Sequence, residues 1–135
     1  MNPEELLYSE THEWTQLSEE GGAKFATVGI SQFAAKELGD LTYIELPTIG
    51  DVVQATKPFG VIESVKAAYD IYAPVDGEVV AINERIAADD DDPDALDVIT
   101  SDPQGEGWMV KIKITDESNL QKLLDFAAYQ KQCEQ

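Results

Sequence analysis

The sequence has few of the residues from which enzymes and metalloproteins build their sites. It holds one cysteine, Cys133, and one histidine, His12. A single thiol cannot form an internal disulfide, which fits a reducing compartment, and one thiol with one imidazole cannot make a zinc or iron site. A hydrolase would need a base beside its nucleophile, yet His12 stands near the start of the chain and no Gly-x-Ser-x-Gly elbow occurs. The sequence therefore predicts neither a catalytic nor a metal centre.

Glycine-rich phosphate loops and long apolar runs are also missing. The nine glycines never fall in the spacing of a dinucleotide-binding or Walker loop, which argues against nucleotide enzymes. No membrane span, basic-plus-apolar signal peptide or Arg- and Ser-rich transit peptide is visible. We expect the cytoplasm of a bacterium, although a mature organellar protein without its presequence would look similar.

Basic residues are scarce: 9 Lys and Arg face 27 Asp and Glu, for a net charge of -18. An acidic protein repels nucleic acid and attracts basic patches on other proteins, so we expect protein partners and no nucleic acid or membrane. The length of 135 residues suits one domain over residues 1–135 with a real apolar core, and we expect a monomer.

Short alternating runs predict a mainly β chain with little helix. The expected strands cover residues 11–17, 25–30, 41–46, 52–53, 58–63, 78–83 and 108–114. Ser31 can cap a helix over residues 32–38, and Gly39 can end it. Asp116 can cap a final helix to about Gln130. Its apolar stripe is expected to pack on the sheet and consists of Leu120, Leu123, Leu124, Ala127 and Ala128.

Acidic residues crowd the segment 84–102, which holds eight of them against Arg85. Such a composition is typical of a solvated, mobile loop. We therefore expect an acidic loop insertion at about residues 87–97.

Lys66 lies between two strand-like runs, 58–63 and 70–73, and so is predicted at the tip of a tight hairpin. An ordinary lysine in a turn is only a solvated charge. A lysine that carries a cofactor must stand clear of a rigid body, and its long stem then gives the reactive group reach. The tip position therefore suits a carrier protein.

Several segments along nearly the whole chain match, in the same order, the motifs of one known protein family. They are His12-Glu-Trp14, Val28-Gly-Ile-Ser31, Leu38-Gly-Asp40, Glu45-Leu-Pro47, Glu63-Ser-Val-Lys-Ala67, Pro74-Val-Asp-Gly-Glu-Val79 and Gly107-Trp-Met-Val-Lys-Ile112. Together they resemble the glycine cleavage H-protein family, in which the segment like 63–67 is the lipoylation motif. Between Asn83 and Trp108 the sequence departs from the family pattern through its acidic extension.

The resemblance implies a lipoyl/biotinyl-carrier type barrel sandwich hybrid: two antiparallel sheets, short peripheral helices and a C-terminal helix. It implies a non-catalytic carrier with lipoate attached covalently to Lys66, inside the motif Glu63, Ser64, Val65 and Ala67. The partners implied are glycine decarboxylase (P protein), aminomethyltransferase (T protein), dihydrolipoamide dehydrogenase (L protein) and a lipoate-attaching enzyme. The carrier would take the aminomethyl group of glycine from the first to the second, and the L protein would reoxidise the arm.

A loaded amine needs shelter from water, and a carboxylate near it can pair with its charge. By position, Glu13 and Asp70 are the candidates for a protecting cleft, with Thr11 as a weaker neighbour. Four other interpretations stay open: a relay that donates lipoyl groups to other enzymes, a lipoyl domain of a 2-oxo acid dehydrogenase complex, a biotin carrier and an acidic scaffold. Val65 and Ala67, the neighbours of Lys66, fit the 2-oxo acid dehydrogenase domain and the biotin carrier less well.

Overall fold

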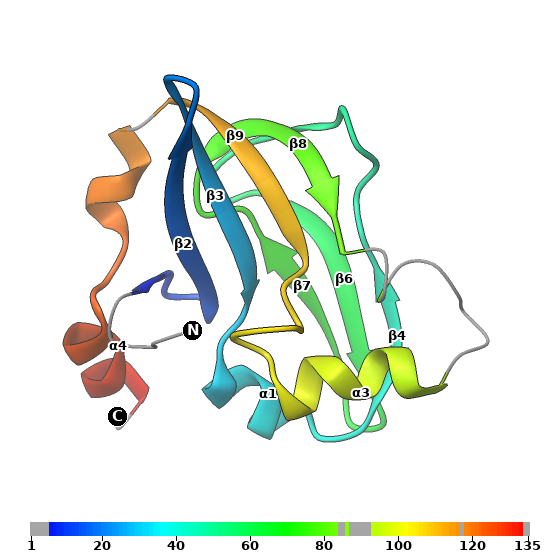
Figure 1. The fold of residues 1–135 in the computed structure, drawn as a ribbon. Helices are drawn as coiled ribbons and strands as arrows, with labels where there is room; N and C mark the ends of the chain where they lie inside the picture. Colours follow the sequence, from blue (N-terminus) through cyan, green and yellow to red (C-terminus); the bar gives the residue numbers. More distant parts are fainter. Residues whose placement is uncertain (1–5, 84–85, 87–92, 117, 134–135) are drawn as a thin grey trace.

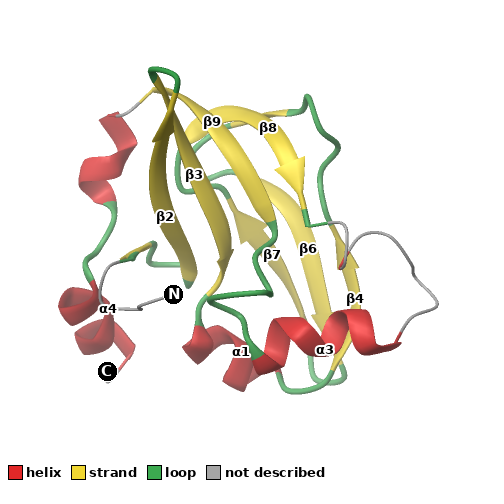
Figure 2. Cartoon of the chain, in the orientation of Figure 1, coloured by secondary structure: helices red, strands yellow, loops and turns green. Residues whose placement is uncertain are grey.

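A computed structural model describes residues 6–83, 86, 93–116 and 118–133, and in this part of the chain two antiparallel sheets dominate (Figures 1 and 2). The larger sheet has the order β1-β2-β3-β9-β8-β5 and the smaller the order β4-β6-β7. The strands are β1 (Leu7–Tyr8), β2 (Glu13–Glu20), β3 (Ala23–Ile30), β4 (Leu41–Glu45), β5 (Val52–Val53), β6 (Pro58–Ser64), β7 (Ala68–Tyr72), β8 (Asp76–Ile82) and β9 (Val110–Asp116). Short helices lie at the periphery (Figure 2), as the sequence predicts.

The predicted strands are present with small shifts at their ends. Residues 11–12 form a turn, so the first long strand is β2, while β7 and the short β1 complete the sheets. Helix α1 (Gln32–Leu38) is confirmed with its ends: Ser31 Oγ accepts the N–H of Ala34, and Gly39 closes the helix at φ 71°. Positive φ there favours glycine, because it carries no Cβ.

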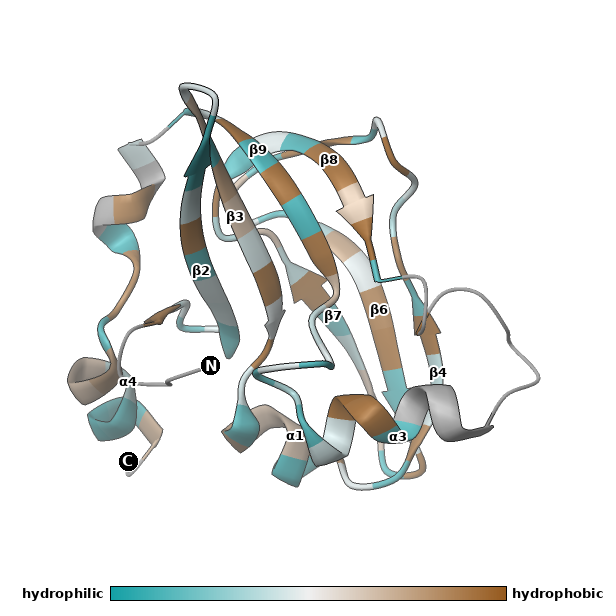
Figure 3. Cartoon of the chain, viewed as in Figure 1, coloured by the Kyte–Doolittle hydropathy of each residue, from teal (hydrophilic) through white to brown (hydrophobic). Residues whose placement is uncertain are grey.

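The core lies between the two sheets, where alternate side chains of each strand point inward. Figure 3 shows the alternation of apolar and polar residues along β3 and β9. Val28, Val79 and Ile112 are fully buried in this core, and Ile62 and Ile71 meet them from the smaller sheet. A second apolar cluster, under helix α4 (Phe126–Cys133), consists of Leu6, Tyr8, Trp14 and Tyr129.

The packing of Trp14 on Gly29 explains the register in which β2 and β3 pair. It pairs with Gly29 across the strands, and its indole covers that glycine so closely that a Cβ there would lie 2.8 Å from Trp14 Nε1. The indole N–H donates to the carbonyl oxygen of Pro103 at 2.7 Å. The glycine thus makes room for a buried aromatic ring directly behind Glu13.

The prediction of a solvated loop over 84–102 is wrong for its second part. Residues Pro93–Ser101 form helix α3, which packs on β4 and α1 and buries Val98 and Ile99 in the main core. Two apolar pairs, 95–96 and 98–99, recur at helical spacing there, and this pattern outweighs the acidic composition. The predicted insertion at 87–97 therefore overlaps a helix from residue 93 onward, and residues 87–92 lie outside the described part of the chain.

The prediction of one helix from 116 to 130 is also wrong. Asp116 ends β9, and its carboxylate accepts the N–H of Ser118 at the start of a 3-10 helix, η2 (Ser118–Lys122). Leu124 then pairs with Tyr8 through two backbone hydrogen bonds of 2.6 and 2.7 Å, which require extended backbone and interrupt the helix. Asp125 caps α4 by accepting the N–H of Ala128. As a consequence Ala127 and Ala128 are exposed, and the predicted stripe does not form one face.

Candidate functional site

Lys66 stands at the tip of the β6–β7 hairpin, as predicted. Glu63 pairs with Ala68, which leaves residues 64–67 for the turn, and the N–H of Ser64 closes it by donating to the carbonyl oxygen of Ala67 at 2.8 Å. The Ser64 hydroxyl oxygen accepts the N–H groups of Lys66 and Ala67 at 3.2 and 3.3 Å. The backbone N–H groups of Ser64, Lys66 and Ala67 thus find acceptors within the turn, while the side chain of Lys66 is exposed.

The hairpin tip is also tied to the end of helix α1. The N–H of Val65 donates to the carbonyl oxygen of Asp40 at 3.1 Å, whereas the Val65 side chain is 69% exposed. The stem of Lys66 passes close to Gly39, where a Cβ would lie 4.0 Å from Lys66 Cε. The tip is therefore anchored on one side, which gives a mobile group on Lys66 a fixed origin.

A cleft of about 560 Å³ begins beside the hairpin and runs between β7, the turn at 11–13 and helix α1. The three predicted cleft residues Thr11, Glu13 and Asp70 all line it, so the structure brings together residues that are far apart in the sequence. The whole lining consists of Thr11, His12, Glu13, Ile30, Phe33, Ala34, Glu37, Leu38, Ile62, Ala68, Tyr69, Asp70, Ile71 and Tyr72. A mostly apolar wall with a few acidic groups suits a flexible apolar arm that ends in a cation.

Glu13 is the buried acid of this cleft, with only 2% of its surface exposed. Burial raises the pKa of its carboxyl to about 7, although hydrogen bonds from the Thr11 and Ser9 hydroxyls and the Tyr72 backbone act in the opposite direction. Both hydroxyls donate to Glu13 Oε1, the one from Ser9 at 2.7 Å. A carboxyl poised near neutrality can lose its proton when a cation enters beside it.

Asp70 and Thr11 are exposed and stand at the margin of the cleft, in contrast to Glu13. Asp70 lies on β7 opposite Val61 of β6, four residues beyond Lys66. An exposed carboxylate attracts a cation only weakly, because water and salt screen its charge. Asp70 therefore adds only a screened negative charge at the margin of the cleft.

Sequence reasoning missed part of the cleft wall. Phe33 and Glu37 of α1 and Tyr72 of β7 line it, and His12 lines it too, with its ring centroid 5.0 Å from that of Phe33. Phe33 and Glu37 are one helical turn apart, so their common face is the signal that could have identified them. The Nδ1 atom of His12 also forms a hydrogen bond with the hydroxyl of Tyr129 in α4.

Metal and membrane features are absent from the part of the chain that the structure describes. No group of three His, Cys, Asp or Glu side chains there could hold a metal ion. None of the helices in the same residues has the length and apolar character needed to cross a bilayer. Cys133 is half-buried and packs on the second apolar cluster.

Comparison with known proteins decides the family. A model of the family described as "Glycine cleavage H-protein" matches residues 6–135. The chain belongs to this family. H proteins are the lipoyl carriers of the glycine cleavage system, and this chain has that function.

Individual members of the family are similar over almost their whole length. The glycine cleavage system H protein of Rhodopirellula baltica is 47% identical over 132 residues, which is 98% of this chain and 95% of that protein. The H protein of Thermotoga maritima is 44% identical over 95% of each chain. The crystal structure of an H protein from Mycobacterium marinum superposes with a TM-score of 0.81 at 33% identity, covering 99% of this chain and 100% of the other. The mainly β fold of two antiparallel sheets is thus that of an H protein.

Proposed function

We propose that Lys66 is the residue that carries the lipoyl group. Its amine is exposed at the tip of a turn that is held by internal hydrogen bonds. This supports the proposal, because a modifying enzyme needs access to the amine and a mobile arm needs a rigid point of attachment. Glu63, Ser64, Val65 and Ala67 shape that turn. When bound, lipoate supplies a dithiolane that accepts the aminomethyl group of glycine.

The cleft protects the amine cargo from water. The single observation that carries this proposal is Glu13, a carboxyl buried at the wall of a cavity that opens beside Lys66. A bound ammonium favours the ionised carboxylate, so the pKa of Glu13 falls from about 7 when the cargo enters. Thr11 holds the carboxylate by a hydrogen bond, and Asp70 adds negative charge at the margin.

The partners proposed are the other components of the system: the P, T and L proteins and a lipoate-attaching enzyme. The chain itself performs no catalysis in this proposal, since its residues hold and shelter the cargo while the partners carry out the reactions. We propose that it acts in the cytoplasm of a bacterium, which its bacterial relatives support. We further propose that it acts as a monomer, because its net charge of -18 makes copies of the chain repel one another.

The attachment site is tested by exposing wild-type protein, Lys66→Arg and Lys57→Arg to a lipoate-attaching enzyme and measuring the intact mass and peptide map. We expect one lipoyl group on the wild type and on Lys57→Arg, which changes the lysine beside the start of β6. Lys66→Arg should gain none. Lipoylation of Lys66→Arg, or biotin in its place on the wild type, would contradict the assignment.

The carrier role is tested by mixing lipoylated protein with the P protein and glycine, and following carbon dioxide release and the mass of the cargo. Glu13→Gln and Asp70→Asn should still load but lose the cargo faster, because a hydrogen bond to a charged group contributes about 1.5–3 kcal/mol when buried and less at an exposed site. Glu19→Gln, on the exposed half of β2, is the matched control. Failure of the wild type to load would favour a lipoate relay instead.

A further inference from the structure

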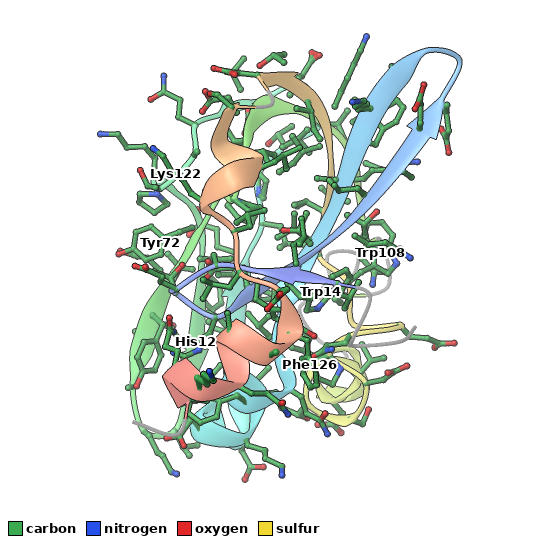
Figure 4. The ribbon with its side chains drawn as sticks, turned by 90° about the vertical axis from the view of Figure 1, so that its left-hand side faces the viewer. His12, Trp14, Tyr72, Trp108, Lys122 and Phe126 are labelled. Atoms are coloured by element: carbon green, nitrogen blue, oxygen red, sulfur yellow. The ribbon has the colours of Figure 1, made fainter. Side chains whose placement is uncertain are left out.

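The side chains of His12, Ser31 and Tyr129 meet where helix α4 approaches the wall of the cleft. The Tyr129 hydroxyl lies 2.7 Å from His12 Nδ1 and 2.5 Å from Ser31 Oγ. The three residues come from the turn before β2, the cap of α1 and the C-terminal helix, and His12 and α4 can be followed in Figure 4. None of these contacts involves a residue of the β6–β7 hairpin that bears Lys66.

The hydrogens of this group can be placed by asking which acceptors are at hand. Ser31 is fully buried and its Oγ accepts the N–H of Ala34, so its own hydroxyl hydrogen is satisfied by donating to the Tyr129 oxygen. The Tyr129 hydroxyl also interacts with the thiol of Cys133, but sulfur is the weaker acceptor. The hydroxyl therefore donates to His12 Nδ1, and the remaining imidazole hydrogen sits on Nε2. The opposite direction would leave the buried Ser31 hydrogen without an acceptor among these groups, which is costly.

His12 is kept neutral by its surroundings. Burial lowers the pKa of its imidazole, and the negative charge of Glu37 on α1 only partly offsets this. Its ring lies against Phe33 and lines the cleft. A neutral imidazole with a fixed hydrogen offers one defined donor, whereas a mixture of tautomers offers none.

The backbone at His12 is strained and depends on its neighbours. Its φ is 75°, a region that residues with a Cβ seldom adopt. Its N–H donates to the Ser9 carbonyl, and its carbonyl accepts the N–H of Ser31 at 2.8 Å. The same turn presents the Ser9 and Thr11 hydroxyls to the carboxyl of Glu13. Displacement of the His12 ring therefore loosens the turn that holds the buried acid.

Tyr129 is well fixed for such a role. It is 3% exposed, and its ring stacks on Tyr8 with a centroid distance of 4.5 Å and an interplanar angle of 7°. Tyr8 in turn belongs to β1, which also pairs with Leu124. The C-terminal helix is thereby clamped to the sheet, with the Tyr129 hydroxyl pointing to the cleft side.

We propose that Tyr129 is a positioning residue of the cleft: its hydroxyl fixes His12 as the neutral imidazole with hydrogen on Nε2 and so holds the turn at 9–13 around Glu13. This rests on the proposed function of the cleft as the shelter of the amine cargo. The C-terminal helix then contributes to protection of the cargo although none of its residues lines the cleft.

The first test needs no partner and no lipoyl group. His12 is the only histidine in the chain, so the ¹⁵N shifts of its two ring nitrogens are read without assignment. We expect the Nε2–H form in the wild type and a mixture of forms in Tyr129→Phe. Tyr8→Phe is the matched control, because it removes a hydroxyl from the same stack that bonds to Gln104 instead.

An Nδ1–H form in the wild type would overturn the proposal, and that result does not depend on any variant folding. Wild-type shifts in Tyr129→Phe would overturn it as well. Both outcomes leave the proposed function of the cleft untouched.

The second test uses the lipoylated proteins loaded with aminomethyl by the P protein and glycine. Tyr129→Phe should lose its cargo about fivefold faster than the wild type, the factor that one net hydrogen bond supplies. Tyr8→Phe, which perturbs the same cluster, should keep the wild-type lifetime. Equal lifetimes for Tyr129→Phe and the wild type would overturn the role in protection, while failure of the wild type to load would refute the proposed function and leave the tautomer result standing.

Discussion

Glu13 is the buried carboxyl group of the cleft, and its pKa is raised. It lies between Thr11 on the surface and Trp14 in the core, and its carboxyl is buried without a cationic partner in its described contacts. Hydroxyl and backbone donors stabilise its charged form, but they do not fully replace water, so its pKa is raised. In the proposed function, a cation that enters the cleft would favour the ionised carboxylate and lower this pKa.

The raised pKa predicts a dependence of stability on pH. Between the ordinary value of 4.5 and about 7 the folded protein holds a proton on Glu13 that the unfolded chain has lost. The stabilisation is therefore complete below 4.5 and lost as pH rises through 7, by about 3 kcal/mol at most. Denaturant unfolding of wild type and Glu13→Gln from pH 4 to 8 measures it. The difference between them should grow in favour of the variant as pH rises, whereas Glu19→Gln should follow the wild type.

At the scale of elements, helix α3 is a core-packing helix whose acidic composition led to the prediction of a solvated loop. Asp97 is exposed, while Val98 and Ile99 are 7% and 0% exposed. The loop that follows it also depends on the contact, because a Cβ on Gly107 would lie 2.8 Å from the carbonyl oxygen of Val98. Helix α3 therefore covers the end of the core beside α1, the helix that walls the cleft.

Truncation of Ile99 should reveal this structural role. Ile99→Ala should lower the free energy of unfolding by about 2–4 kcal/mol, the range for loss of a large aliphatic side chain in a packed core. Ser101→Ala, at the exposed end of the same helix, should change it by about 0.5 kcal/mol or less. Thermal or urea unfolding gives both values. An Ile99→Ala variant as stable as the wild type would mean that α3 contributes little to the core.

At the scale of the whole molecule, the dominant property is the net charge of -18 on 135 residues. Such a charge repels itself in the folded state and attracts partners whose docking surfaces are basic. Positive side chains are accordingly valuable: Lys111 pairs with Glu20 at 3.2 Å and stands 4.8 Å from the centre of the Phe25 ring. The same charge makes separate copies of the chain repel one another at long range.

Screening of this charge should stabilise the fold. The thermal midpoint should rise as sodium chloride increases from about 0.01 to 0.15 M, because the Debye length falls from roughly 30 to 8 Å over that range. Potassium chloride serves as the control for ion-specific effects. A midpoint that falls or stays constant in both salts would show that the acidic groups do not repel one another appreciably in the folded protein.

The sequence by itself determined the parts of the protein that depend on local chemistry. Alternation of apolar residues indicated most strands, and Ser31 and Gly39 marked the ends of α1. The strand-like runs 58–63 and 70–73 placed Lys66 at a hairpin tip. The order of motifs pointed to the family that the comparisons establish. Each of these signals lies within a few residues, where spacing and side-chain type are sufficient.

Only the tertiary structure decided what depends on contacts between distant segments. The bridge from Leu124 to Tyr8 interrupts the expected final helix, and the core contact of Ile99 makes a helix of an acidic segment. Composition and periodicity do not predict such pairings, because they describe neighbouring residues and the backbone partner is 116 residues away. Likewise the burial of Glu13, and the meeting of His12 with Tyr129, arise from packing of the folded chain. The sequence gives the places of Glu13 and His12 along the chain, whereas the pKa of each side chain depends on the groups that surround it in the fold.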